Sequence, residues 1–182
     1  MKASVFVGVS VDGFLARRDH TLDFLPEEPE EHGYTEFFAS ADAMVIGRHT
    51  YDVVLGFGGW AYGTKPVFVL STRELTGAPA GAVVERLSGE PAAIWARLEA
   101  RGFAHLYVDG GVTIQRFLAA GLIHRLVVTR VPVLIGEGIP LFGPTGHDIG
   151  LRHVATRSYP SGLVQTEYEV VPAGRRPTGG AP

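Results

Sequence analysis

Short apolar runs rich in β-branched residues alternate with helix-like patterns along the first two thirds of the chain. Between the runs, apolar residues recur at helical spacing, as Ile94, Trp95 and Leu98 do. This alternation predicts an α/β fold with a mainly parallel sheet, because parallel strands need crossover connections that are usually helical. The predicted strands are 4–11, 43–46, 67–70, 82–87 and 105–108, and the predicted helices are 30–40, 48–54, 90–101 and 112–120.

The last third of the chain has a different pattern. Residues 125–135 form a long β-like run that contains Pro132, and 151–159 and 163–170 look like two strands joined at Pro160-Ser161-Gly162. This hairpin adds antiparallel strands to the sheet. No repeat or linker divides the chain, so we expect a single domain over 1–172 and a disordered tail over 173–182.

Composition excludes several classes of protein. The chain has 182 residues, 46% of them apolar, no Cys and a formal net charge of −3. A chain without Cys has no disulfide, thiol nucleophile or cysteine zinc site, and its scattered histidines predict no metal site. The slight negative charge disfavours non-specific nucleic-acid binding. The N-terminal apolar run is too short for a signal peptide or a membrane span, so we expect a cytoplasmic protein with no nucleic-acid or membrane partner.

Two of the predicted strands are followed by a short turn that contains glycine and then by a helix, in Ile46-Gly47-Arg48-His49 and in Val108-Asp109-Gly110-Gly111. A helix N-terminus offers free N–H groups and the positive end of a dipole, and glycine lets the backbone approach a phosphate. Each turn alone could simply reverse the chain, with Asp109 as a cap. Two such turns in one α/β chain favour a ligand at the carboxyl ends of the strands.

Weaker patterns lie near the third strand. Ser71-Thr72-Arg73 could hold a ribose phosphate, although Ser and Thr also cap ordinary turns. Gly56-Phe57-Gly58-Gly59-Trp60-Ala61 spells a dinucleotide fingerprint, but no strand precedes it and no helix follows, so we interpret it as a loop. A P-loop and a nucleophile elbow are absent from the sequence, which excludes a P-loop kinase and disfavours a serine hydrolase.

Two acidic segments allow more than one interpretation. Asp12-Gly13 ends the first strand and is typical of a tight turn, yet Asp12 is also a carboxylate at the carboxyl edge of a strand expected at the sheet centre. There it could bind a substrate or supply a proton. The run Glu27, Glu28, Glu30 and Glu31 is most simply a solvated helix start.

Five segments, taken in order, resemble the dihydrofolate reductase-like superfamily, and most closely its RibD C-terminal-like branch, the reductase domain of bacterial riboflavin biosynthesis. The segments are 10–16, 46–51, 68–72, 108–111 and 132–142, they occur in the order of the family, and the resemblance spans nearly residues 3–171. The resemblance implies a mixed, mostly parallel sheet of about eight strands with flanking helices and a C-terminal antiparallel hairpin. It also implies that the protein binds NADPH.

The resemblance assigns cofactor contacts by position. Gly47, Arg48, His49 and Thr50 would meet the cofactor phosphates, and Gly110, Gly111, Val112 and Thr113 would cradle the diphosphate. Ser71, Thr72 and Arg73 would lie at the adenosine 2′-phosphate, and Leu15 and Ala16 would border the nicotinamide. Because lysine is scarce, Arg48 and Arg73 are the expected determinants of NADP over NAD.

The substrate half departs from folate reductases, which carry a buried carboxylate on the first helix after a Trp-containing loop. Here Glu31 matches that acid only loosely, and Phe14 stands near the place of the Trp. We therefore expect an oxidoreductase that transfers a hydride from NADPH to a small pterin, pyrimidine or similar heterocycle. Asp12 is the expected catalytic and substrate-binding residue. Phe14, Tyr51 and Trp60 are candidate substrate walls, Trp60 being equally compatible with a loop anchor.

Two alternatives remain open. The chain could be a 5-amino-6-(ribosylamino)uracil reductase of riboflavin biosynthesis, although it has no deaminase zinc motif of the kind often fused to such reductases. It could also be a non-catalytic NADP-binding dimer. We also expect a homodimer, and strand 125–135 and segment 139–142 could form its face.

Overall fold

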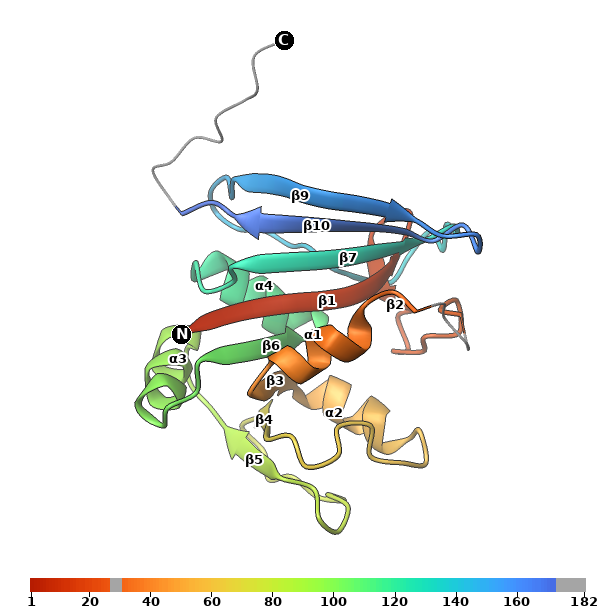
Figure 1. The fold of residues 1–182 in the computed structure, drawn as a ribbon. Coiled ribbons are helices and arrows are strands. Elements are labelled where there is room, and N and C mark those ends of the chain that lie inside the picture. The colour runs from red at the N-terminus through yellow and green to blue at the C-terminus, as the bar shows by residue number, and fades with distance from the viewer. Residues whose placement is uncertain (27–30, 173–182) are drawn as a thin grey trace.

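A computed structural model describes residues 1–26 and 31–172 and contains an eight-stranded sheet in the order β5-β4-β3-β6-β1-β7-β10-β9 (Figure 1). Neighbouring strands from β5 to β7 are parallel, and β7, β10 and β9 are antiparallel. The strands are β1 (Lys2–Ser10), β3 (Ala43–Gly47), β4 (Val67–Leu70), β5 (Val84–Leu87), β6 (His105–Asp109), β7 (Arg125–Val131), β9 (Leu151–Ser158) and β10 (Val164–Val170). The mixed, mostly parallel sheet with a C-terminal hairpin is confirmed.

Helices cover both faces of the parallel part of the sheet (Figure 1). They are α1 (Tyr34–Ser40), α2 (Arg48–Leu55), α3 (Pro91–Ala100) and α4 (Gly111–Ala119). One hydrophobic core joins α3 and α4 to the sheet, and a second joins α1 and α2 to the opposite face. Met44, Val45 and Ile46 of β3 are fully buried, as expected for a parallel strand covered on both faces.

The strand order brings the two glycine turns together. After β3 the chain runs outward through β4 and β5, and then returns to insert β6 between β3 and β1. Ile46 of β3 and Asp109 of β6 are paired residues in the sheet, so the turns that start α2 and α4 lie side by side. In open α/β sheets, ligands bind at such crevices outside the carboxyl ends of the strands.

Some boundaries of the strands differ from the predicted ones, and one short pair of strands was not predicted. Strand β7 ends at Val131 rather than 135, because Pro132 cannot donate to the ladder. A second sheet, which the sequence did not predict, pairs β2 (Phe14–Ala16) with β8 (Ile139–Pro140). The predicted disordered tail, and Glu27, Glu28 and Glu30 of the acidic run, lie outside the described residues.

The expected dimer face is not free in this fold. Strand β7 is hydrogen-bonded to β1 on one edge and to β10 on the other, so it offers no edge to a partner. Leu141 is only 1% exposed, although Phe142 and Leu134 are 50% and 71% exposed. Segments 125–135 and 139–142 therefore belong largely to the body of the domain, because their apolar residues complete its own core.

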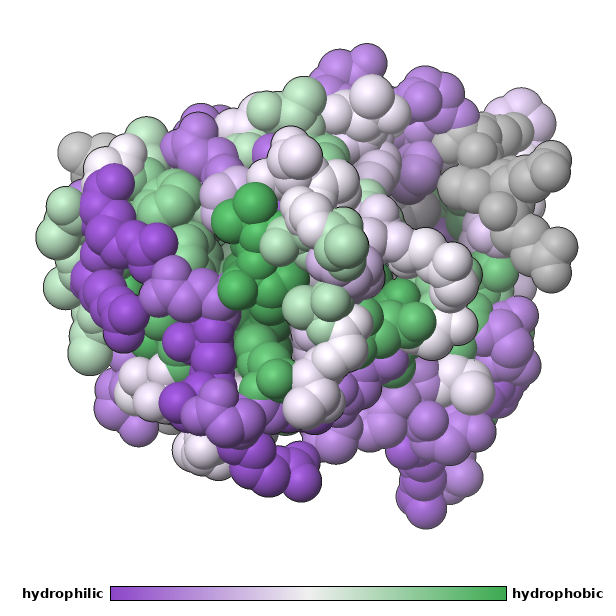
Figure 2. Space-filling model, turned by 90° about the horizontal axis from the view of Figure 1, so that it is seen from below, coloured by the Kyte–Doolittle hydropathy of each residue, from purple (hydrophilic) through white to green (hydrophobic). Residues whose placement is uncertain are grey.

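Figure 2 views the molecule from below, the side on which β4, β5 and α2 lie in Figure 1. Hydrophobic residues gather in the middle of this view, and hydrophilic residues surround them. Phe57, in the loop after α2, and Val83, just before β5, are among the exposed hydrophobic side chains.

In the described part of the chain, no helix combines the length and apolarity needed to cross a membrane.

Candidate nucleotide-binding site

A cavity of about 790 Å³ lies at the carboxyl ends of the central strands. Its walls come from the start of α2, the start of α4, the middle of β1, and the segment from β2 to Leu25. The volume lies within the range of small-molecule and cofactor sites, about 300–1,000 Å³. Most of the predicted cofactor residues line it: Leu15, Ala16, Gly47, Arg48, His49, Thr50, Gly110, Gly111, Val112 and Thr113.

The two turns are packed so closely that side chains would not fit. Gly110 has φ +92°, and a Cβ atom there would collide with Oγ1 of Thr50 and lie 3.7 Å from the backbone nitrogen of Gly47. At Gly47, a Cβ atom would lie 2.9 Å from Oγ1 of Thr113. Glycine at these positions therefore lets the two helix starts meet, with their backbones at the cavity wall.

The first-turn residues of both helices line the cavity. Neither α2 nor α4 has a side-chain hydrogen bond at its N-cap, which is Gly47 or Gly110. The first-turn N–H groups of a helix have no partner within the helix, and the helix dipole adds positive potential at the same end. Two such ends beside one cavity suit a ligand with more than one phosphate group.

Basic side chains add to this potential. Arg18, Arg48 and Arg116 line the cavity together with His20 and His49. The rings of His20 and His49 stack with centroids 4.5 Å apart, and His20 adopts the left-handed φ of 69°. Sequence reasoning missed Arg18, His20 and Arg116, because long-range folding brings them to the cavity and no local motif marks them.

An apolar wall covers another side of the cavity. Leu15 and Ala16 of β2 lie opposite Ile139 of β8, and Leu25 packs directly over β1. A Cβ atom at Gly8 would lie 2.9 Å from Cδ2 of Leu25, so glycine there lets Leu25 approach the strand. This combination of an apolar wall and a polar rim suits a ligand that has both flat rings and phosphates.

Asp109 is the acidic residue at the meeting point of the two turns. It ends β6, lines the cavity and accepts a hydrogen bond of 2.7 Å from the backbone N–H of Gly110. Burial raises the pKa of Asp109 to about 6, and the Gly110 N–H opposes this shift. The sequence indicated Asp109 only as a turn cap, since its enclosure depends on the neighbouring elements.

The comparisons with known proteins agree with this fold. The family model of the RibD C-terminal domain matches residues 2–165. The chain belongs to the RibD C-terminal domain family. The fold and its similarity to solved proteins of this type also confirm the dihydrofolate reductase-like resemblance.

Individual relatives cover most of the chain. YwjB of Bacillus subtilis (strain 168) is 30% identical over 165 residues, which is 87% of this chain and 92% of YwjB. A putative riboflavin biosynthesis protein from Shewanella sp. PV-4 is 38% identical, with a TM-score of 0.84 over 94% of this chain and 99% of that protein. A pyrimidine reductase-like protein from Corynebacterium diphtheriae is 18% identical, with a TM-score of 0.68 over 93% and 92% of the two chains.

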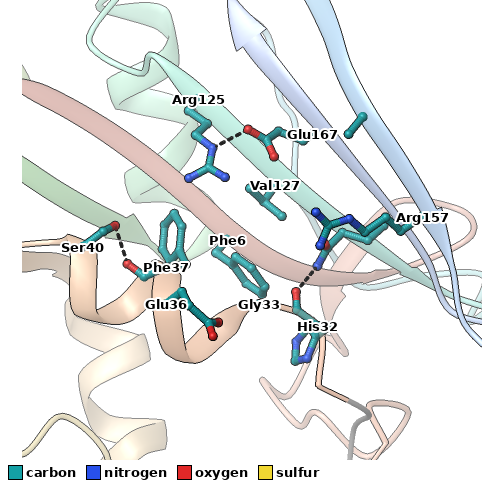
Figure 3. A pocket seen from close by; sticks show the side chains of 12 residues that line it. Phe6, His32, Gly33, Glu36, Phe37, Ser40, Arg125, Val127, Arg157 and Glu167 are labelled. Carbon is teal, nitrogen blue, oxygen red and sulfur yellow. Dashed lines mark hydrogen bonds and ion pairs between the residues drawn. The ribbon is translucent and has the colours of Figure 1, made fainter.

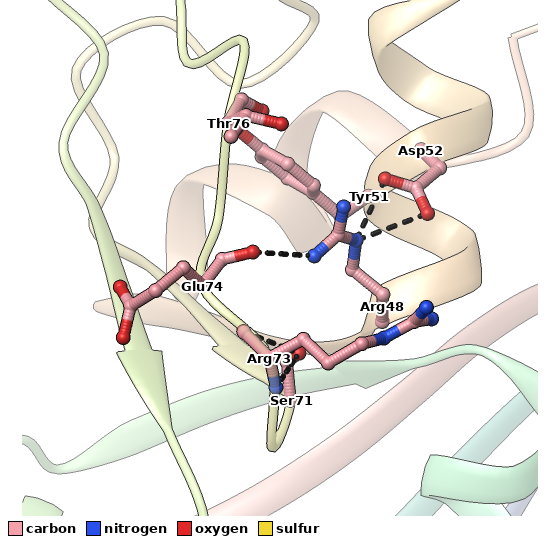
Figure 4. Close-up of polar contacts among 7 residues, drawn as sticks. All are labelled: Arg48, Tyr51, Asp52, Ser71, Arg73, Glu74 and Thr76. Carbon is pink, nitrogen blue, oxygen red and sulfur yellow. Dashed lines mark hydrogen bonds and ion pairs between the residues drawn. The ribbon is translucent and has the colours of Figure 1, made fainter.

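Within this RibD C-terminal domain, the predicted 2′-phosphate residues lie at the margin of the cavity. Ser71, Thr72 and Arg73 follow β4 and are not part of the lining, whereas Leu70 and Arg48 are. The Ser71 hydroxyl donates to the backbone oxygen of Arg73 and accepts from its N–H, at 2.8 and 3.0 Å. Figure 4 shows this turn beside Arg48, with the Arg73 side chain extending toward α2.

Asp12 and Glu31, the candidate acids, lie outside the cavity lining. The Asp12 carboxylate accepts backbone N–H groups from Ile135 at 3.3 Å and Gly136 at 2.8 Å. Hydrogen bonds, with the Ser10 side chain first, lower the pKa of Asp12, so it is ionised and holds a loop. Glu31 accepts the N–H of Gly33 at 2.9 Å, before α1.

The three aromatic residues predicted to form substrate walls also lie outside the cavity lining. Tyr51 is fully buried, and its hydroxyl donates to the backbone oxygen of Thr76 at 3.1 Å. Trp60 packs between Tyr51 and Tyr62, with ring centroids at 6.2 and 5.1 Å. Phe14 pairs with Pro140 in the small sheet. These rings pack within the fold and do not line this cavity, and their role as substrate walls stays a prediction.

A second cavity, of about 360 Å³, lies between α1 and the strands β7, β10 and β9 (Figure 3). Arg125 donates to Glu167 at 2.7 Å, and Gln165 donates to the backbone oxygen of His32 at 3.0 Å. Phe6 lines both cavities, but no residue predicted from the sequence lines this one. Across residues 1–26 and 31–172, no three His, Cys, Asp or Glu side chains form a candidate metal site.

Proposed function

We propose that this protein is an NADPH-dependent reductase that transfers a hydride to a small pterin, pyrimidine or similar heterocycle. The observation that carries the proposal is the meeting of two uncapped, glycine-started helices at one cavity. Membership of the RibD C-terminal domain family supports it, since the resemblance to that branch implies NADPH.

The cavity residues fit a dinucleotide. Gly110, Gly111 and the first turn of α4 would hold the diphosphate, with Gly47 and Thr50 completing the cradle from α2. Leu15 and Ala16 would lie against the nicotinamide ring. A Cβ atom at Gly111 would lie 3.0 Å from Cγ2 of Ile139, so close packing leaves little room for a side chain at this position.

The adenosine 2′-phosphate would lie between Arg48 and Arg73, beside Ser71 and Thr72. Arg48 is 21% exposed and Arg73 is exposed, so both guanidinium groups can reach a phosphate at the cavity margin. Arginine is well suited to this task, because its planar fork binds phosphate oxygens in pairs.

When bound, NADPH supplies the hydride, and the protein contributes orientation, exclusion of water and proton supply. Hydride transfer to a C=N or C=O group leaves a nitrogen or oxygen that needs a proton. We assign that proton to Asp109 rather than to Asp12, because Asp109 faces the cavity and its pKa of about 6 keeps a protonated fraction near neutral pH.

The class of substrate rests on the relatives. The similar solved proteins are described as a putative riboflavin biosynthesis protein and a pyrimidine reductase-like protein. These names support a nitrogen heterocycle, and they keep 5-amino-6-(ribosylamino)uracil reduction as a second candidate. Complementation of a bacterial strain that lacks this reduction step would separate that pathway role from a reductase with another substrate.

A non-catalytic NADP-binding module is distinguished by turnover. The protein should bind NADPH, detected by the fluorescence of its two Trp residues, and should oxidise it when a matching pterin or pyrimidine is present. Binding without turnover across a broad panel of such heterocycles would favour the module. Failure to bind NADPH or NADH at millimolar concentration would contradict the proposed function.

A further inference from the structure

Arg48 is held by two neighbouring residues, Asp52 on α2 and Glu74 in the segment after β4. Its Nε donates to Oδ1 and Oδ2 of Asp52, one helical turn along α2, at 2.8 and 3.0 Å. Its Nη1 donates to the backbone oxygen of Glu74 at 2.8 Å. The Glu74 carboxylate pairs with Arg86 at 2.8 Å, so Asp52 is the carboxylate that contacts Arg48.

These contacts leave part of the guanidinium fork available. Of the five N–H groups of an arginine, Nε and one on Nη1 are used, which leaves three. In Figure 4 the Arg73 side chain extends beneath Arg48, and within the described residues its guanidinium has no hydrogen-bond or ion-pair partner. The Ser71 turn holds the Arg73 backbone in place. Two arginines thus border one space, but only one of them has a counter-ion.

We propose that Asp52 is a specificity-determining residue that weakens the preference of this site for a 2′-phosphorylated nucleotide. The inference rests on the proposed function, in which Arg48 and Arg73 receive the 2′-phosphate. The Asp52 carboxylate occupies the Nε side of the fork and neutralises Arg48, so an incoming phosphate meets a partly compensated cation and a nearby like charge.

The size of the effect follows from Coulomb's law. A phosphate on the free side of the guanidinium would lie about 7 Å from the carboxylate, where two unit charges in water change an equilibrium about threefold. A phosphate monoester carries close to two negative charges. Removal of the Asp52 charge should therefore strengthen binding of the 2′-phosphate by about three- to tenfold.

The test is the substitution Asp52→Asn, which removes the charge and keeps an oxygen that can accept from Arg48 Nε. Calorimetry would compare 2′,5′-ADP with 5′-AMP, and NADPH with NADH. We expect affinity for 2′,5′-ADP and NADPH to rise about three- to tenfold, with affinity for 5′-AMP and NADH unchanged. The gain should disappear in about 1 M salt, because salt screens the interaction and would not alter a purely structural role.

Glu99→Gln is the matched control. Glu99 also forms an ion pair, with the N-terminal amino group at 3.1 Å, but it lies on α3 and does not line the cavity. This variant should leave all four affinities unchanged, and melting temperatures should show that both variants fold.

The outcomes separate the two claims. If the wild-type protein prefers NADPH and Asp52→Asn leaves the NADPH to NADH ratio unchanged, or lowers it, the role of Asp52 is overturned while the proposed function stands. If the wild-type protein binds neither dinucleotide, the proposed function fails and the inference fails with it.

Discussion

Asp109 shows how the surroundings of one residue change its chemistry. A carboxyl group in an unfolded chain has a pKa near 3.9, whereas burial raises the pKa of Asp109 to about 6 in the fold. The folded protein therefore keeps this proton while the unfolded chain loses it. The group contributes to stability at low pH, and this contribution is lost as the pH rises from about 4 to about 6.

Asp109→Asn should remove this pH dependence. Above about pH 7 the variant should be more stable than the wild-type protein by up to about 3 kcal/mol, and the difference should vanish near pH 4. Urea unfolding at both pH values measures it. An equal difference in stability at about pH 4 and about pH 7 would show that folding does not raise the pKa of the Asp109 carboxyl group. The same variant should lose most of the proposed reductase activity and retain nucleotide binding.

Asp12 offers a contrast at the same scale. Its carboxylate receives the N–H groups of Ile135 and Gly136 and lies outside the cavity lining. Asp12→Ala should lower the melting temperature by a few degrees, because two backbone donors lose their acceptor, while NADPH affinity changes less than about threefold. A complete loss of turnover with normal stability and normal NADPH affinity would restore the catalytic role suggested by the sequence.

Among the secondary-structure elements, the small sheet of β2 and β8 positions the apolar wall of the cavity. A Cβ atom at Gly138 would collide with the backbone oxygen of Ala16 and lie 3.2 Å from Cβ of Phe14. Glycine at this position therefore allows the two short strands to pair. Leu15 and Ala16, which line the cavity, depend on that pairing for their position.

Gly138→Ala should separate β2 from β8 and weaken NADPH binding by at least about tenfold, with a loss of stability of about 1–3 kcal/mol. Gly59→Ala is the matched control, because a Cβ atom at Gly59 would have no neighbour within 4 Å. NADPH titration and thermal melting would be compared for both variants. An unchanged NADPH affinity in Gly138→Ala would show that the small sheet does not position the nicotinamide wall.

For the molecule as a whole, the homodimer stays a prediction. The sheet ends at two strands that are paired on one edge only, β5 and β9, while β7 lies inside it. A dimer should therefore keep the pairing of β7 with β1 and β10 as it is in one chain. At micromolar concentration it should sediment with twice the 19.5 kDa mass of one chain. A 19.5 kDa species under those conditions would contradict the prediction.

Local patterns were sufficient to predict most of the fold. The apolar runs of β3, β4 and β6 are bounded by Gly, Pro or polar residues, so their positions follow from the sequence. The glycines after β3 and β6 predicted two turns at one edge of the sheet, and the strand order makes them neighbours. The two-residue strand β8 could not be predicted, because its pairing with β2 joins segments far apart in the sequence.

Features that depend on enclosure or on distant contacts were beyond sequence reasoning. Asp109 differs from an ordinary turn cap only because neighbouring elements bury it. The contact between His20 and His49 joins a loop to a helix with no motif in common. Tyr51 stands in a segment that resembles a ligand site, yet the helix turns its ring into the core.

If the paired glycine turns bind the diphosphate of NADPH, calorimetric titration should separate the wild-type protein from Gly110→Ala. Gly110 has φ +92°, and a Cβ atom there would collide with Oγ1 of Thr50, so a side chain at this position must displace the cradle. We predict one NADPH bound per wild-type chain, with affinity reduced at least about a hundredfold in a still folded Gly110→Ala. Equal affinity in the two proteins, or no binding to the wild type at millimolar NADPH, would show that these turns do not bind the diphosphate.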